Sequence, residues 1–152
     1  MEMKTYIGTK IIEAVPAIRK GCRVYEKDQP IPKSMAPDEE GYKICYPDGY
    51  EFFSPKAEFE AEYREIDCLS FGLAIEAAKK GKRIARRGWN GKNQYVEIAE
   101  RISYENAAHE VINANHEAIG NKALAFVGTS GIQMGWLASQ ADMLADDWEI
   151  VE

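Results

Sequence analysis

The sequence is poor in the residues that build disulfide frameworks, metal sites and membrane spans. Its three cysteines, Cys22, Cys45 and Cys68, form no closely spaced pair, which argues against disulfides and zinc and suits a reducing cytoplasm. No apolar run approaches the ~20 residues that cross a bilayer. Residues 1–6 contain no apolar stretch of the kind found in a secretory signal. We therefore expect a cytoplasmic protein without a membrane partner or a metal.

Side chains that commonly carry catalysis are also scarce. The two histidines, His109 and His116, are seven residues apart, so a helix would hold them ~10 Å apart, too far to share a metal ion. No serine lies in a nucleophile elbow, and the glycine-containing turns match neither the P-loop nor the dinucleotide-binding fingerprint. We expect no catalytic residue and no cofactor.

The charge is unevenly spread along the chain. The formal net charge of −6 is unsuited to coating DNA or RNA through phosphates. Seven of the fourteen residues from 79 to 92 are nevertheless basic. Such a segment in an acidic molecule suits a small anionic ligand better than a polymeric nucleic acid. A solvated helix end, with lysines placed against the helix dipole, explains the first part of the segment equally well.

The pattern of strands, turns and short helices predicts an α+β fold, mainly antiparallel sheet, in two modules. The first module covers residues 1–66 and is β-rich, with a strand-like run over 5–15. Aromatic and β-branched residues on both sides of Pro47-Asp48-Gly49 predict a β-hairpin. Ser54 as N-cap and Pro55 in the first turn then predict a short helix that ends at Glu62.

The second module is predicted over residues 69–152. Ser70 is a candidate N-cap for a helix that Gly81 would end, and Trp148 lies in an alternating strand as a core residue would. Residues 103–119 are expected to form a helical insertion. The other predicted elements are hairpins that pair 82–86 with 95–98 and 123–127 with 132–135, a short helix over 139–144 and a closing strand over 147–151.

Two tryptophans differ from Trp148 in their surroundings. Trp89 and Trp136 each lie beside glycine in a predicted turn, next to small polar residues. Their faces could stack on a nucleobase, and nearby arginines and turn amides could hold phosphate. Packing of the two turns against the protein explains the same pattern equally well.

These turns lie in segments that resemble the second Thoeris anti-defence family of phage proteins. The resemblance covers residues 69–152 and rests on Arg86-Arg87-Gly88-Trp89-Asn90-Gly91 and on the segment from Trp136 to Trp148, which contains Ser139-Gln140-Ala141-Asp142. Gly135 stands where the family pattern has proline. Members of this family bind cyclic ADP-ribose isomers, the signals of Thoeris immunity, without degrading them. Some members also hold cyclic di- or trinucleotides at a separate site.

The resemblance implies a homotetrameric sponge, with pockets at subunit contacts, that acts in the cytoplasm of the infected bacterium. Trp89 and Trp136 would sandwich adenine or line the pocket, and Arg87 would face the pyrophosphate. Residues 1–66 resemble a small phage-encoded accessory module of unassigned function. The predicted ligand-binding residues are Arg87, Trp89, Asn90, Gly91, Trp136, Ser139, Gln140 and Asp142.

Two other functions compete with the sponge. An enzyme that cleaves a nucleotide signal, with Asp142 or His116 as the base, would show turnover and usually require a divalent metal. A protein-interaction module would use the tryptophans as interface anchors and would be indifferent to nucleotides.

Overall fold

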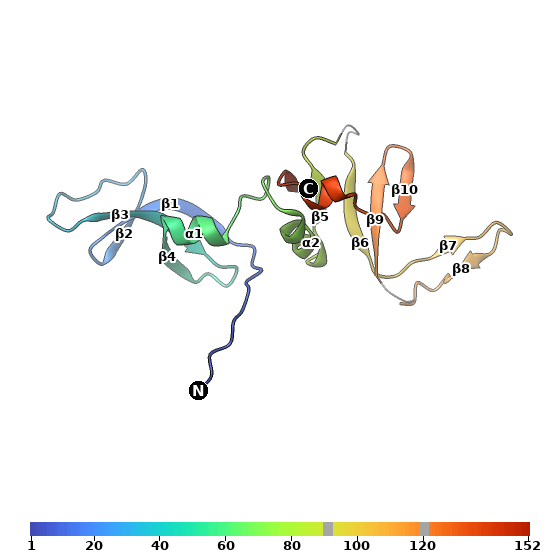
Figure 1. The fold of residues 1–152 in the computed structure, drawn as a ribbon, viewed down its shortest axis with the longest axis horizontal. Helices are drawn as coiled ribbons and strands as arrows, with labels where there is room; N and C mark the ends of the chain where they lie inside the picture. The colour runs from blue at the N-terminus through green and yellow to red at the C-terminus, as the bar shows by residue number, and fades with distance from the viewer. Residues whose placement is uncertain (90–92, 119–121) are drawn as a thin grey trace. The chain divides into compact units, whose positions relative to one another are not determined.

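The computed structural model describes residues 1–89, 93–118 and 122–152 and consists mainly of antiparallel sheets with a few short helices (Figure 1). The predicted α+β class is therefore confirmed. The chain divides into two compact units, Met1–Arg64 and Glu65–Glu152. No helix within the described ranges combines the length and the apolar character that crossing a membrane requires.

The first unit contains a four-stranded antiparallel sheet in the order β2-β1-β3-β4. The hairpin predicted around residues 47–49 joins β3 to β4. Gly49 adopts a φ of 88°, and its N–H donates to the carbonyl of Tyr46 at 2.8 Å. This backbone conformation favours glycine, which has no Cβ to clash. The strands are β1 (Glu13–Lys20), β2 (Arg23–Glu26), β3 (Asp38–Cys45) and β4 (Glu51–Pro55).

The strand predicted over 5–15 is wrong, because β1 runs from Glu13 to Lys20. The register gives the reason: Glu13 pairs with Cys45, the last residue of β3, so β3 ends where the expected strand would have continued. A strand requires a neighbour that completes its main-chain hydrogen bonds, and β-branched residues alone do not supply one.

Helix α1 (Lys56–Glu62) follows β4 directly and packs on β3 and β4 (Figure 1). Its N-cap is Pro55 rather than the predicted Ser54, which is buried in β4. The ring of Tyr42 on β3 stacks on Phe59 of α1, with centroids 4.0 Å apart. The fully buried apolar side chain of this unit is Ile44, so the core is small.

The second unit contains a five-stranded antiparallel sheet in the order β10-β9-β6-β5-β11. The two predicted strand pairs and the closing strand are confirmed, with ends that differ by at most one residue. The strands are β5 (Arg83–Arg86), β6 (Tyr95–Ala99), β9 (Ala123–Gly128), β10 (Gly131–Met134) and β11 (Trp148–Val151).

Helix α2 (Phe71–Lys79) packs on β5, β6 and β11, and the short helix α3 (Gln140–Met143) contacts α2. As predicted, the Ser70 hydroxyl caps α2 by accepting the N–H of Leu73, and Gly81 follows the helix with a φ of 88°. Trp148 is fully buried, which confirms it as a core residue. The buried cluster between α2 and the sheet consists of Leu69, Ala74, Ala77, Ala78, Ile84, Val96 and Trp148.

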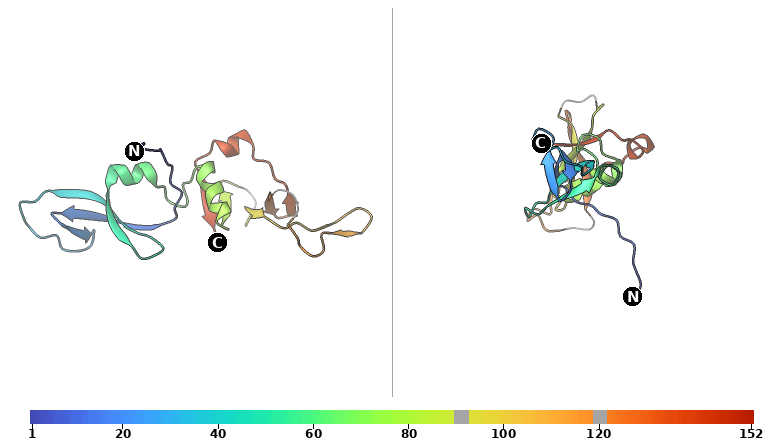
Figure 2. Two further views of the ribbon diagram at one scale, coloured as in Figure 1. Left: turned by 90° about the horizontal axis from the view of Figure 1, so that it is seen from below. Right: turned by 90° about the vertical axis from the view of Figure 1, so that its left-hand side faces the viewer.

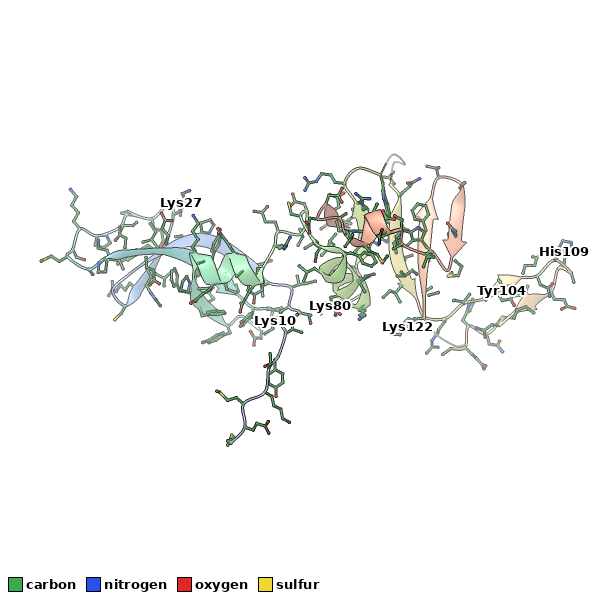
Figure 3. The ribbon with its side chains drawn as sticks, in the orientation of Figure 1. Lys10, Lys27, Lys80, Tyr104, His109 and Lys122 are labelled. Carbon is green, nitrogen blue, oxygen red and sulfur yellow. The ribbon has the colours of Figure 1, made fainter. Side chains whose placement is uncertain are left out.

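The helix predicted over 103–119 is wrong. The described residues of this segment form a two-stranded hairpin, β7 (Tyr104–Glu105) and β8 (Val111–Ile112), which projects beyond the five-stranded sheet (Figures 1 and 2). His109 lies at the tip of the hairpin and Lys122 near its base (Figure 3).

Asparagine side chains explain why this segment turns instead of forming a helix. The Asn106 carboxamide oxygen accepts the N–H groups of Ala108 and Glu110 at 3.0 and 2.9 Å. Asn113 has a left-handed φ of 57°, and its carboxamide oxygen accepts the N–H of Glu117 at 3.0 Å. Such local hydrogen bonds compete with the helical ladder, and the segment has too few apolar residues to favour the helix by packing.

Candidate ligand-binding site

The three tryptophans of the chain meet in one aromatic cluster. Trp89 follows β5, Trp136 follows β10 and Trp148 begins β11. The Trp89 ring centroid lies 5.9 Å from that of Trp136 and 5.4 Å from that of Trp148. Phe126 of β9 contacts Trp89 and Trp136 at 5.4 and 6.3 Å. The structure therefore brings together the two tryptophans that the sequence singles out, although they are far apart in the chain.

The cluster is partly core and partly surface. Trp148 is fully buried, whereas Trp89 and Trp136 are half-buried and pack against the buried cluster. The planes of Trp89 and Trp136 are inclined at 72°, an edge-to-face arrangement. Edge-to-face rings enclose no parallel slot for a base, so a nucleobase would stack on the exposed face of one indole.

The turn before Trp136 depends on glycine. Gly135 has a φ of 78°, and the N–H groups of Gly135 and Trp136 both donate to the carbonyl of Leu124 at 2.9 Å. Proline, which the resemblance leads us to expect here, is held near a φ of about −65° and has no N–H to donate. Gly135 therefore sets a backbone conformation beside Trp136 that proline could not adopt.

Three predicted ligand residues lie at the start of α3. The Ser139 hydroxyl and main-chain N–H donate to Asp142 Oδ2 at 2.8 and 3.1 Å, and the N–H of Asp142 donates to Ser139 Oγ at 3.1 Å. This reciprocal pair is a capping box, which satisfies the free N–H groups of a helix start. Gln140 is exposed, and its side chain forms no hydrogen bond within the described ranges.

Arg86 was not among the predicted site residues, yet it holds α3 in place. Its Nη1 donates to Asp142 Oδ1 at 2.9 Å, and its Nε donates to Asp147 Oδ1 at 2.9 Å. A signal for this role exists in the sequence, because β-alternation places Arg86 on the same face as the buried Ile84. An arginine on a core-facing side needs carboxylate partners.

The Arg86 ion pairs set the charge state of the group. Burial acts to raise the pKa of Asp142, but hydrogen bonds from Arg86 and Ser139 outweigh burial and hold that pKa below its usual value. The pKa of Arg86 is raised most by its hydrogen bond with Asp147 and next by its hydrogen bond with Asp142. Asp142 is therefore ionised at neutral pH, and both of its carboxylate oxygens are hydrogen bonded.

Arg87 is directed toward a different part of the unit. Its Nη2 donates to the main-chain carbonyl of Asp67 and to Cys68 Sγ, the latter at 3.4 Å. Its main-chain N–H donates to the carbonyl of Asp147 at 3.0 Å. The remaining predicted ligand residues, Asn90 and Gly91, lie outside the described residues.

The first unit contains a cavity of about 280 Å³. It is lined by Lys27 and by residues of β1, β3 and the start of α1, and none of its lining residues belongs to the predicted ligand set. Among the described residues, no three His, Cys, Asp or Glu side chains are grouped as metal ligands. His109 Nδ1 lies 2.8 Å from Glu105, and His116 Nδ1 lies 3.2 Å from Ser103, so the histidines have separate partners.

Comparison with known proteins identifies relatives of the second unit. Residues 69–151 match the family described as Thoeris anti-defense 2-like domain. A protein of Bacillus phage SP01, Thoeris anti-defense 2, is 34% identical over 86 residues, which cover 55% of this chain and 94% of that protein. The resemblance identified from the two tryptophan-containing segments is confirmed.

Proposed function

The chain belongs to the Thoeris anti-defense 2-like family of phage anti-defence proteins, and from this premise we propose that it is a sponge for a cyclic ADP-ribose isomer. It binds the signal and withholds it from the immune effector without cleaving it. The observation that carries the proposal is the meeting of Trp89 and Trp136, half-buried, within the region that matches the family.

The aromatic cluster supplies the affinity for the base. Stacking of one base on an aromatic side chain contributes about 1–3 kcal/mol, and both indoles keep part of their surface exposed. The exposed Gln140 carboxamide, directly after Ser139 in the chain, offers a donor and an acceptor for hydroxyl groups or base edges. Arg87 binds the pyrophosphate, and the phosphate oxygens then replace Asp67 and Cys68 as its hydrogen-bond partners.

The state of Asp142 favours binding over cleavage. The competing enzyme hypothesis uses this carboxylate as the general base. A base with a lowered pKa has little affinity for the proton that it must accept, and the Asp142 oxygens are already hydrogen bonded to Arg86 and Ser139.

Self-association completes the proposal. Several large apolar side chains of the second unit are exposed, and β10 is an edge strand without a charged residue. Edge strands of this kind pair readily with a second chain. A homotetramer that buries them would enclose the ligand at subunit contacts. The exposed side chains are Ile132, Met134, Leu137, Met143 and Leu144.

Calorimetry with cyclic ADP-ribose isomers, followed by denaturation and chromatography of the released ligand, tests the proposal. We expect tight binding and release of the intact ligand. Of Trp89→Ala and Trp136→Ala, the variant that removes the stacking indole should weaken binding about 5- to 150-fold, as expected for the loss of one stacked base, and the other should weaken it less. Tyr104→Ala, which removes an aromatic ring that is 53% exposed on β7, is the matched control and should bind normally.

The alternatives give different results in the same experiment. Release of a cleaved product would identify an enzyme. Absence of heat with every isomer would contradict the sponge and favour the protein-interaction module.

A further inference from the structure

Arg86 joins three segments of the second unit through one guanidinium group. It ends β5, and its Nε and Nη1 donate at 2.9 Å to Asp147 and to Asp142. Asp142 belongs to α3, and Asp147 immediately precedes β11. The Arg86 side chain is 24% exposed and that of Asp142 is 16% exposed, so solvent screens this pair less than an ordinary surface ion pair.

The same group of residues reaches the aromatic cluster. The main-chain carbonyl of Asp142 accepts the indole N–H of the buried Trp148 at 2.8 Å. The Trp148 ring lies 5.4 Å from Trp89 and 6.3 Å from Trp136. Through its side chain, Asp142 also holds Ser139, three residues after Trp136. A displacement of Asp142 would therefore move both the buried indole and the segment that carries Trp136.

We propose that Arg86 is a positioning residue: it fixes the orientation of Trp89 and Trp136 through Asp142 and Trp148 and does not touch the ligand. This inference rests on the proposed function, because the surface that Arg86 orients is the one that binds the signal. Two carboxylates neutralise the guanidinium, so it has little charge to offer to a phosphate. Asp142 accordingly acts inside this network rather than as a ligand contact.

The geometry requires arginine rather than any cation. The planar guanidinium donates to Asp147 through Nε and Nη2, at 2.9 and 3.5 Å, while Nη1 serves Asp142. An ammonium group is a single point charge and cannot hold two carboxylates in this fixed relation. Arg86→Lys should therefore retain the attraction but lose the fixed angle between α3 and the segment before β11.

Arg86→Gln is the test, and Arg83→Gln is the matched control. Both substitutions remove one positive charge from β5, but Arg83 is exposed and pairs with Glu97 at 3.5 Å. The first readout is near-ultraviolet circular dichroism of the ligand-free chain, which reports how the tryptophans are held. The second is the affinity for a cyclic ADP-ribose isomer by calorimetry, at a temperature where far-ultraviolet spectra show every variant folded.

We expect Arg86→Gln to lose most of the tryptophan near-ultraviolet signal and about tenfold or more in affinity, because small displacements of a preorganised surface are costly. Arg86→Lys should keep part of the near-ultraviolet signal and part of the affinity, and Arg83→Gln should match the wild type in both. If Arg86→Gln does not fold, Asp147→Asn, which keeps the residue's shape but removes one charge of the network, should show the same two changes in smaller degree.

Three results would overturn the inference: an unchanged near-ultraviolet spectrum, a changed spectrum with unchanged affinity, or equal losses in Arg83→Gln. Failure of the proposed function is distinguishable, because wild type would then bind no isomer. In that case the claim that Arg86 supports ligand binding is wrong as well. The spectra of the ligand-free variants still decide whether Arg86 orients the tryptophans.

Discussion

The two units of the chain are stabilised in different ways. The second unit buries seven apolar residues in one cluster that includes a fully buried tryptophan. In the first unit, only Ala17 and Ile44 are buried apolar residues, and its aromatic rings stack at partly exposed positions such as Tyr42 on Phe59. Burial of apolar surface is the main favourable contribution to folding. The second unit, which contains the candidate site, therefore has the more extensive core.

The ion pairs made by Lys43 in the first unit and by Arg86 in the second differ in exposure. In the first unit, Lys43 pairs with Glu26 and Glu51 at 3.1 and 3.4 Å, and all three side chains are about one-third exposed or more. Exposed pairs of this kind contribute about 0–1 kcal/mol each. In the second unit, Arg86 pairs with two less exposed carboxylates. Both Lys43 and Arg86 connect elements of the fold, but solvent screens the ion pairs of Arg86 less.

The largest effect is expected at Trp148. Trp148→Ala should lower the free energy of unfolding of the second unit by about 3–5 kcal/mol, because it empties the centre of the core and removes the hydrogen bond to Asp142. Urea unfolding followed by far-ultraviolet circular dichroism measures the loss. Trp148→Phe should cost less, and equal losses for the two variants would show that volume is not what Trp148 contributes.

Ile44→Ala tests the smaller core of the first unit. The side chain is fully buried, and its truncation should cost about 2–4 kcal/mol. All three tryptophans lie in the second unit, so their fluorescence reports that unit alone. We expect the tryptophan-detected urea midpoint to stay unchanged while the far-ultraviolet transition broadens. A shift of the tryptophan midpoint would mean that the two units unfold together.

Gly135→Pro tests the turn beside Trp136. The substitution conflicts with the φ of 78° and removes an N–H that donates to Leu124, so the second unit should lose about 1–3 kcal/mol. Gly135→Ala keeps the N–H and should cost about 1 kcal/mol, the penalty for a left-handed φ with a Cβ. Thermal unfolding compares the two variants, and proline tolerated as well as alanine would contradict the described turn.

The smallest effect concerns Asp142 and pH. Its pKa is lowered in the folded chain, so its contribution is complete above the unfolded pKa of about 3.9 and disappears as the pH falls below that value through the folded pKa. Asp142→Asn should therefore reduce the stability lost between pH 5 and pH 2, an interval of about three pH units around these pKa values. Glu100→Gln, at an exposed pair with Lys122, is the control and should change this acid dependence less.

Local sequence signals predicted the elements that depend on neighbouring residues. The Ser70 cap, the end of α2 at Gly81 and the turn at Gly49 all follow from residues within one turn of each other. The prediction failed for 103–119, where alanines and scattered apolar residues resemble a helix but Asn106 and Asn113 hydrogen bond locally. The pairing of β1 with β3 could likewise not be predicted from a local pattern.

The candidate site was also predicted only in part from the sequence. The sequence by itself determined that Trp89 and Trp136 stand apart from ordinary core positions, because glycine and polar residues flank them. Only the tertiary structure decided that these indoles meet edge to face, that Arg87 faces Asp67 and Cys68, and that Arg86 holds Asp142 and Asp147. Those two carboxylates lie 56 and 61 residues along the chain from Arg86, and at such separations the folded sheet, not local geometry, decides which charges become neighbours.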